Sequence, residues 1–292
     1  MDKILRSIDW YAVMQELWGT GFAFYHLDPC LAEVQRTGLR EFLKRRTERG
    51  DADQWAFKRL GEETDNPDVG LEKFDGSEVD PISGLPKDCK SRFHDDCTLR
   101  ERVSQTSLRL SQEDHFFLEQ TEYFREINNA FSYKQAATLD DLQGLHCANE
   151  VHLCQQYSTP FATTTQRGLY YSAQQVAGGA QAHIDRSFLS NHSGDQGGKL
   201  EAFIDGNWEC ISPPEGQAVV FLGVKALWVT HGEKQPLLHR STTTVDEERT
   251  ATVHFGQIRL RDYELRDSSI AAADYGRLFQ ERASAGEYHW QL

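Results

Sequence analysis

The chain has 292 residues, 39% of them hydrophobic and 26% charged, which is the composition of an ordinary globular protein with room for a real core. The formal net charge of −14 argues against a general affinity for nucleic-acid backbones or anionic membranes. We therefore expect a small-molecule substrate, no nucleic-acid partner and no membrane partner.

The chain also lacks the usual signs of export. No apolar run approaches membrane-spanning length, and the first residues lack the apolar centre of a signal peptide. Without a CxxC pair, the cysteines are expected to be reduced and mostly structural, in a cytoplasmic protein that is a monomer or a weak homo-oligomer. The six cysteines are Cys30, Cys89, Cys97, Cys147, Cys154 and Cys210.

The N-terminal region, residues 1–150, is predicted to be mainly helical. A first helix follows the capping residue Asp9 and ends at Gly19, because apolar residues recur between them at helical spacing. A short strand is expected over residues 22–27, and a second helix over residues 29–50.

Residues 51–98 are rich in Asp, Gly, Pro and Lys and show little periodicity. Most of this segment is predicted to be a long loop, of the kind that often covers a functional site. A helical region is expected next, starting at Ser111, where Asp114 completes a cap, and running with breaks to about Asn149.

The residue composition and its periodicity change from residue 151 onward. Short runs rich in Tyr, Thr, Val, Phe and Ile alternate with Gly, Pro and Asn, which predicts an antiparallel sandwich or barrel over residues 151–262. The last residues, 263–292, are expected to return to helix. We predict a single domain over residues 1–292, mainly β with flanking α-helices.

A histidine and an aspartate lie two positions apart in "GGAQAHIDRSFLS". Side chains alternate along an extended chain, so His183 and Asp185 can offer a nitrogen and an oxygen to one ion. A second imidazole comes from His239 in "QPLLHRSTTT", more than fifty residues further along. Two histidines and one carboxylate form the facial triad of non-haem Fe(II) oxygenases, which leaves positions open for a cosubstrate and O₂. These three residues are called the metal triad below.

An arginine follows the metal triad at the start of the next expected strand, "DEERTATVHF". Its guanidinium can reach the same cavity if this strand lies beside that of His239. Arginine is the best residue for clamping a carboxylate with two parallel hydrogen bonds. A dicarboxylate could therefore chelate the metal at one end and bind Arg249 at the other.

This ordered set resembles the Fe(II)/2-oxoglutarate-dependent dioxygenases, in the branch that includes isopenicillin N synthase and the plant flavonoid and gibberellin oxygenases. That branch carries H-x-D, a second histidine a little over fifty residues later, and R-x-S about ten residues beyond it. Further similar segments extend the resemblance over nearly the whole chain. They are "GTGFAFYHLD", "GLYYSA", "GGKLEAFIDGNWECISPPEGQAVVFLG" and "WVTHGEKQPLLHRS".

The resemblance implies a double-stranded β-helix, the cupin-like jelly roll, with Fe(II) on the metal triad. It further implies that 2-oxoglutarate chelates the iron with its far carboxylate on Arg249, and that O₂ takes the remaining site. Tyr171 matches a tyrosine that binds this carboxylate in relatives. The serine of R-x-S is Ala251 here, so one hydroxyl contact to the cosubstrate is missing.

The activity implied is hydroxylation, desaturation or cyclisation of a small molecule, with release of succinate and CO₂. Two alternatives stay open. One is an Fe(II) oxidase of the isopenicillin N synthase type, which needs no 2-oxoglutarate. The other is a non-catalytic jelly-roll binding protein that keeps a relic site.

Other residues compete for a role in the site. Arg186, His192 and Phe188 are candidate substrate contacts, although a residue such as Phe188 is more often a core residue than a substrate contact. A second H-x-D, His94 and Asp96, falls in the expected loop, with His152 further on, and lacks the flanking segments that resemble the family. The cysteines and histidines between residues 146 and 154 have the wrong spacing for a structural zinc site.

Overall fold

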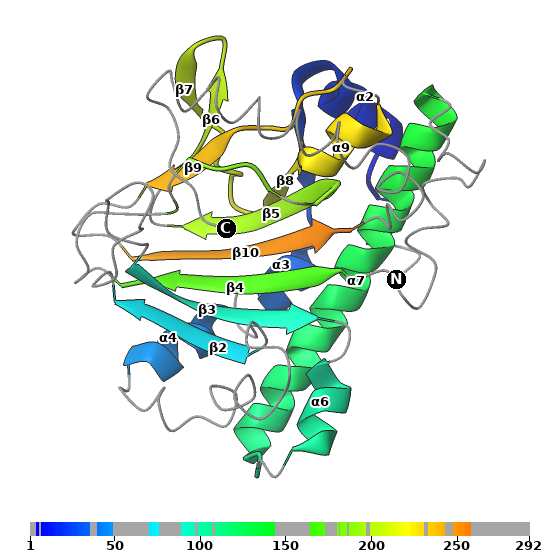
Figure 1. Cartoon of the computed structure of the whole chain (residues 1–292). Helices are drawn as coiled ribbons and strands as arrows, with labels where there is room; N and C mark the ends of the chain where they lie inside the picture. The colour runs from blue at the N-terminus through cyan, green and yellow to red at the C-terminus, as the bar shows by residue number, and fades with distance from the viewer. Residues whose placement is uncertain are drawn as a thin grey trace.

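Figure 1 shows the chain as a computed structural model, with its helices and strands between Trp10 and Gly256. The structure describes residues 4–5, 7–35, 40–48, 70–75, 89–96, 99–106, 109–143, 164–172, 180, 182–185, 187–196, 199–230, 233–242 and 248–257. Within these ranges, no helix has both the length and the apolar character needed to cross a bilayer.

The described part contains helices on the N-terminal side and strands mainly on the C-terminal side. The helices are α2 (Trp10–Thr20), α3 (Pro29–Val34), α4 (Glu41–Glu48), α6 (Leu99–Gln105), α7 (Gln112–Gln143) and α9 (Val224–Val229). The strands are β1 (Phe22–His26), β2 (Gly70–Asp75), β3 (Cys89–Asp96), β4 (Thr165–Tyr171), β5 (Leu189–Gln196), β6 (Lys199–Ile204), β7 (Asn207–Cys210), β8 (Gln217–Leu222), β9 (His239–Thr242) and β10 (Arg249–Gly256).

Two antiparallel sheets form the centre of the molecule. The main sheet has seven strands in the order β1-β8-β5-β10-β4-β3-β2, and the small sheet has three in the order β7-β6-β9. Strands far apart in the sequence lie side by side, such as β10 between β4 and β5 (Figure 1). This crossed connection of two sheets is the jelly-roll arrangement expected from the sequence.

The main sheet has two faces with different neighbours. Its inner face carries Val219 and Phe221 of β8, which pack against Leu200 and Ala202 of the small sheet. Its outer face carries alternate residues of the same strands, such as Val220, and belongs to the large core cluster with α2 and α7. Because side chains alternate along a strand, neighbouring residues of one strand serve different faces.

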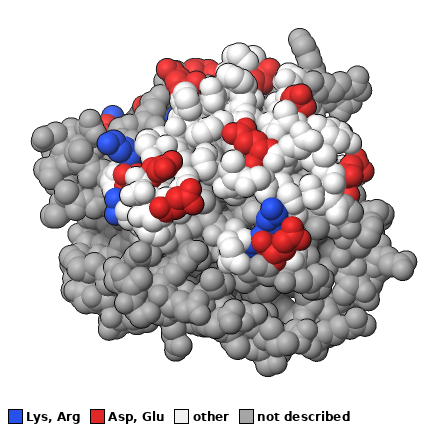
Figure 2. Space-filling model, turned by 90° about the horizontal axis from the view of Figure 1, so that it is seen from above, with Lys and Arg blue, Asp and Glu red and all other residues white. Residues whose placement is uncertain are grey.

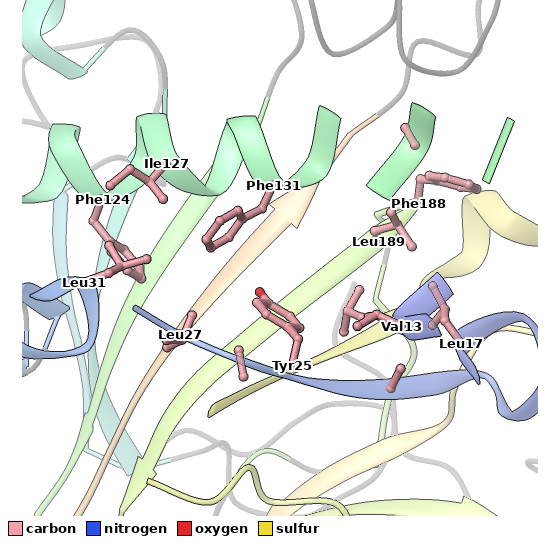
Figure 3. Packing of buried hydrophobic residues seen from close by; sticks show 14 of the residues in the cluster. Val13, Leu17, Tyr25, Leu27, Leu31, Phe124, Ile127, Phe131, Phe188 and Leu189 are labelled. Atoms are coloured by element: carbon pink, nitrogen blue, oxygen red, sulfur yellow. The ribbon is translucent and has the colours of Figure 1, made fainter. Parts of the chain in front are cut away.

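Helix α7 covers the outer face. Figure 3 shows Phe124, Ile127 and Phe131 of α7 pointing toward the strands, where Phe131 meets Tyr25 edge-on with ring centroids 5.8 Å apart. A reciprocal cap starts this helix: the Ser111 N–H donates to the carboxylate of Asp114, and the Asp114 N–H donates to the Ser111 hydroxyl. The predicted cap is therefore confirmed, and α7 runs on without a break to Gln143.

A row of buried polar contacts also joins α7 to the outer face, one from each of four neighbouring strands. These pairs, called the α7 polar row, are Asp95–Arg125, Gln166–Asn128, His254–Asn129 and Asn191–Gln135. Buried polar groups cost free energy unless they are hydrogen-bonded, so each pair fixes how its strand meets the helix.

The N-terminal region contributes more to the sheet than the sequence predicted. Strands β2 and β3 lie within residues 51–98 and extend the main sheet beyond β4, so that segment is not a loop throughout. The second H-x-D, His94 and Asp96, lies on β3 rather than in a loop. The expected jelly-roll bounds of 151–262 were therefore too narrow, because β1 also joins the sheet, beside β8.

Three helix predictions also needed correction. Helix α2 runs past Gly19 to Thr20 and is capped by Gly21, which adopts the left-handed conformation with φ of 89° that closes a helix. The expected helix over residues 29–50 is divided into α3 and α4. Helix α9 was not expected at all, and the C-terminal helix expected over residues 263–292 lies outside the described residues.

Candidate metal centre

The structure brings the metal triad together at one end of the two sheets. Nε2 of His183 lies 3.5 Å from Oδ1 of Asp185, and Nε2 of His239 lies 3.7 Å from the same oxygen. One ligand atom from each residue lies within 4.8 Å of the other two, which allows a single ion to contact all three. The described residues contain no other cluster of this kind.

Backbone pairing holds the two histidines together. The His183 N–H donates to the His239 carbonyl at 2.8 Å, and the His239 N–H donates to the His183 carbonyl at 3.0 Å. The sequence predicted that residues 183 and 185 lie in a strand. Instead, His183 pairs with His239 of β9 as an isolated bridge. The reciprocal pair still sets both imidazoles on one side of the chain.

The aspartate is held by the turn that leads into α9. The N–H groups of Gly223, Val224 and Lys225 donate to carbonyls of the segment that carries Asp185, at 2.8–3.1 Å. A Cβ at Gly223 would lie 2.2 Å from the Ser187 carbonyl oxygen, so only glycine allows this close approach. The short helix α9 therefore fixes the loop that presents the carboxylate.

Side-chain contacts orient two of the three ligands. The Ser190 hydroxyl donates to Oδ2 of Asp185 at 2.6 Å, which leaves Oδ1 facing the histidines. Nδ1 of His239 lies 3.1 Å from the Leu237 carbonyl, so this nitrogen is the one that carries the proton. Nε2 of His239 then keeps its lone pair for a metal, as ligating histidines usually do.

The protonation states suit a cation. Burial and the neighbouring His183 lower the pKa of His239 to about 4, so its imidazole is neutral at pH 7. For Asp185, burial works to raise the pKa, but the two imidazoles and the Ser190 hydroxyl together hold it below its usual range. His239 thus offers a neutral nitrogen and Asp185 an ionised carboxylate, and with the His183 imidazole they form a donor set that Fe(II) accepts.

Arg249 and Tyr171 lie deeper on the inner face, opposite one another on β10 and β4. Both are buried, at 1% and 2% exposure, and Cζ of Arg249 lies 5.0 Å from the centre of the Tyr171 ring. The Tyr171 hydroxyl has no hydrogen-bond partner among the described residues. A buried guanidinium beside a buried donor of this kind suits a carboxylate.

A family comparison agrees with this geometry. A model of the 2OG-Fe(II) oxygenase superfamily matches residues 151–258, which contain the metal triad, Arg249 and Tyr171. These residues carry the sequence pattern of that superfamily. The predicted family is therefore confirmed, while the isopenicillin N synthase-like branch stays a prediction.

Individual relatives are more distant. Gibberellin 20 oxidase 3 of Arabidopsis thaliana is 31% identical over 81 residues, which cover 28% of this chain and 21% of that protein. The chain thus matches about a fifth of the length of this curated relative.

Solved structures show the same fold at low sequence identity. A protein of Neurospora crassa, solved in complex with alpha-KG and 5-formyluracil, has a TM-score of 0.60 at 14% identity, covering 87% of this chain and 79% of that one. JOX2, solved with 2OG, Fe and JA, has a TM-score of 0.57 at 15% identity and covers 86% and 71%. AtDAO1 of Arabidopsis thaliana, a binary complex with 2-oxoglutarate, has a TM-score of 0.57 at 14% identity and covers 86% and 88%. The jelly-roll fold is thereby confirmed.

The remaining candidate residues have different positions. His192 is buried on the inner face of the main sheet, opposite Val253 and Val219, and lies near the metal triad. Phe188 is fully buried in the large core cluster, which favours its role as a core residue (Figure 3). Arg186 lies outside the described residues, as do His152 and the cysteines and histidines between residues 146 and 154.

Sequence reasoning missed the groups that orient the ligands. Ser190 follows Asp185 by five residues, and its position in the same stretch was the available signal. The Leu237 carbonyl and the turn at Gly223 carry no such signal, because backbone contacts depend on the fold. Of the cysteines, Cys30 and Cys210 are free, as expected of reduced thiols, and both are exposed.

Proposed function

We propose that the protein is an Fe(II)- and 2-oxoglutarate-dependent oxygenase that hydroxylates, desaturates or cyclises a small-molecule substrate. The observation that carries the proposal is the approach of three ligand atoms, from His183, Asp185 and His239, to within 4.8 Å of one another. Fe(II) fits these donors because they are two imidazoles and one carboxylate.

Each member of the metal triad has a defined task. His183 and His239 would donate the lone pairs of Nε2, and Asp185 would bind through Oδ1. His183 is 38% exposed at its side chain, while the other two are nearly inaccessible. The site is therefore open on the His183 side, where a cosubstrate and a substrate can enter.

Arg249 and Tyr171 would bind the far carboxylate of 2-oxoglutarate. The guanidinium supplies charge and two parallel donors, and the Tyr171 hydroxyl can donate a further hydrogen bond. Ala251 lies two residues along the same face as Arg249 and is fully buried. Tyr171 would thus supply the hydroxyl that Ala251 lacks.

When bound, iron and 2-oxoglutarate supply the oxidising chemistry, in which O₂ and the 2-oxo acid give succinate, CO₂ and an oxidised substrate. The protein's own residues hold the ligands, anchor the cosubstrate and keep water away from the buried side of the site. None of them has to act as a strong general base, because the bound iron and cosubstrate would supply the oxidising chemistry.

Anaerobic titration of the protein with Fe(II) and 2-oxoglutarate tests the proposal. We expect a weak visible charge-transfer band to appear only when both are present. A non-catalytic binding protein would give no such band. Succinate release in air, screened over small-molecule substrates, then separates the proposal from an oxidase that needs no 2-oxoglutarate.

Two variants sharpen this titration. Arg249→Leu should weaken 2-oxoglutarate by about 10- to 100-fold, because a charge-assisted bidentate contact is lost. Arg249→Lys should weaken it less, since the charge remains without the planar fork. Unchanged 2-oxoglutarate affinity in Arg249→Leu would remove this residue from the anchor role.

A further inference from the structure

Four side chains form a cluster on the outer face of the main sheet, where β4 ends and β10 begins. Lys44 and Glu48 lie on α4, Tyr170 lies on β4, and Glu248 directly precedes β10. Nζ of Lys44 lies 2.5 Å from Oε2 of Glu248 and 3.8 Å from Oε1 of Glu48. These four residues are called the α4 clamp below, and the binding of iron and 2-oxoglutarate proposed above uses none of them.

Tyr170 connects the two carboxylates of the α4 clamp. Its ring is buried in the large core cluster, and its hydroxyl lies 3.2 Å from Oε1 of Glu48 and 3.3 Å from Oε1 of Glu248. Burial and the two carboxylates raise the pKa of Tyr170, so the hydroxyl keeps its proton and can donate to either carboxylate. The hydrogen bond from Lys44 lowers the pKa of Glu248, so this carboxylate is ionised at neutral pH. The α4 clamp is therefore an ion pair supported by a hydrogen bond from a core residue.

Helix α4 is itself fixed to the rest of the fold. The Phe42 ring stacks on that of Phe117 of α7, with the ring centroids 4.3 Å apart. Leu43 packs over β4, since a Cβ added at Gly168 would lie 3.6 Å from its Cδ2. In Figure 1, α4 lies on the same side of the view as the start of β10. Helix α4 therefore provides a fixed support for the α4 clamp.

The α4 clamp lies directly behind the residues proposed to bind the cosubstrate. Arg249 and Tyr171 each follow a clamp residue in the sequence and, since side chains alternate along a strand, lie on the opposite face. They face one another at the first position of the β10–β4 ladder. On the other side of β10, the pairing with β5 begins at Thr250 and has an irregular register. The ends of paired segments open more easily than their centres, so contacts that hold the clamp residues also hold Arg249 and Tyr171 in place.

The charge of the protein makes the position of Arg249 important. The formal net charge is −14, and Figure 2 shows acidic groups spread over the described surface seen from above, with few basic ones. A dianionic cosubstrate therefore gains little from the surface charge on that face. Its far carboxylate depends on the alignment of one guanidinium, because two parallel hydrogen bonds form only in the correct geometry.

We propose that the α4 clamp positions the residues that bind 2-oxoglutarate. Lys44, Tyr170 and Glu248 are positioning residues, which act through the adjoining ends of β4 and β10 and do not touch the cosubstrate. They hold Arg249 and Tyr171 in the arrangement that the far carboxylate requires. This inference rests on the proposed function, because it takes Arg249 as the anchor of that carboxylate.

The test compares two 2-oxo acids on the whole protein loaded with Fe(II) under anaerobic conditions. 2-Oxoglutarate carries the far carboxylate, and 2-oxopentanoate has the same chain length with a methyl group in its place. In calorimetric titrations, Lys44→Met and Tyr170→Phe should each weaken 2-oxoglutarate about two- to tenfold and leave 2-oxopentanoate unchanged. The loss is modest because the side chains of the ion pair are partly exposed, at 28% and 37%. Lys44→Arg should keep most of the affinity, since the positive charge remains.

Arg100→Met is the matched control. Arg100 forms a similar ion pair with Glu122, with an N–O distance of 2.5 Å, between α6 and α7. This variant should change the affinity for neither acid. Unchanged 2-oxoglutarate affinity in both Lys44→Met and Tyr170→Phe would overturn the positioning role. An equal loss for the two acids would also overturn it, because a general disturbance of the fold does not distinguish them.

The unaltered protein and Arg249→Leu separate this inference from the proposed function. We expect the unaltered protein to bind 2-oxoglutarate about 10- to 100-fold more tightly than 2-oxopentanoate, and Arg249→Leu to lose that preference. A preference that survives in Arg249→Leu would overturn the anchor role, and the positioning role with it. Failure of the visible band in the unaltered protein would instead contradict the proposed function.

Discussion

The two faces of the main sheet use buried polar residues in different ways. On the outer face, each polar side chain of the α7 polar row has its partner within the fold, such as Asn191 with Gln135. On the inner face, the metal triad gathers its ligand atoms within 4.8 Å of one another, and the Tyr171 hydroxyl has no partner among the described residues. The outer face therefore stabilises the fold, and the inner face is suited to bind what the fold does not contain.

The two kinds of residue are often direct neighbours in the sequence. Gln166 contacts α7, while Arg167 lies on the inner face. Asn191 and His192 divide between the faces in the same way. A polar residue in a strand of this protein therefore cannot be assigned to structure or to function until its face is known.

The largest expected difference between the faces concerns two buried histidines. His239→Ala should abolish succinate release and metal binding, because the ion loses a ligand. His254→Ala should keep metal binding and instead lose about 1–3 kcal/mol of stability, because the hydrogen bond to Asn129 is lost. Metal titration and chemical denaturation of both variants give the two readouts. Full activity in His239→Ala would contradict the ligand assignment.

The next effect concerns the one ion pair of the α7 polar row. Arg125→Met should cost about 3–5 kcal/mol of stability at pH 8, since it leaves Asp95 without its buried counter-ion. Burial raises the pKa of Asp95 to about 7, although Arg125 works to lower it.

This pKa also determines the pH dependence. The folded protein holds a proton on Asp95 that the unfolded chain releases near pH 4, so stability falls as pH rises from about 4 to 7. Without Arg125 the pKa of Asp95 rises further, so the decline in stability continues to higher pH. The stability difference between Arg125→Met and the unaltered protein, from urea denaturation, should therefore grow from pH 5 to pH 8. A difference that stays constant over this range would contradict the pairing.

The smallest effect compares two buried tyrosines. Tyr171→Phe should weaken 2-oxoglutarate about 3- to 10-fold and leave stability unchanged, because its hydroxyl has no partner in the described fold. Tyr25→Phe should cost about 1 kcal/mol of stability and leave 2-oxoglutarate affinity unchanged, since the Tyr25 hydroxyl donates to Asn191. Calorimetric titration and thermal melting measure both. A loss of stability in Tyr171→Phe together with a loss of 2-oxoglutarate affinity in Tyr25→Phe would contradict this division of roles between the two faces.

The metal triad was predictable from the sequence because its chemistry restricts the residue types and their order. His183, Asp185 and His239, followed by Arg249, form a pattern that is rare by chance. The apolar strands were also predictable, since β8 reads as a continuous apolar run between turns.

Strands with polar buried faces were not predictable in the same way. Strand β3 reads "CKSRFHDD", and its buried residues include His94 and Asp95, so it shows no apolar alternation. Strand β5, "LSNHSGDQ", likewise lacks an apolar alternation, because its buried residues include Ser190, Asn191 and His192. These strands owe their burial to partners on α7 and at the metal centre, which a local pattern does not contain.

The most direct test of the central claim is the position of the metal. Crystals grown without oxygen in the presence of Fe(II) and 2-oxoglutarate should give one strong anomalous peak at the iron absorption edge. We predict that it lies in contact with Nε2 of His183, Nε2 of His239 and Oδ1 of Asp185, with the cosubstrate extending from it to Arg249. A peak bound by other residues, or triad side chains turned away from the ion, would contradict the account.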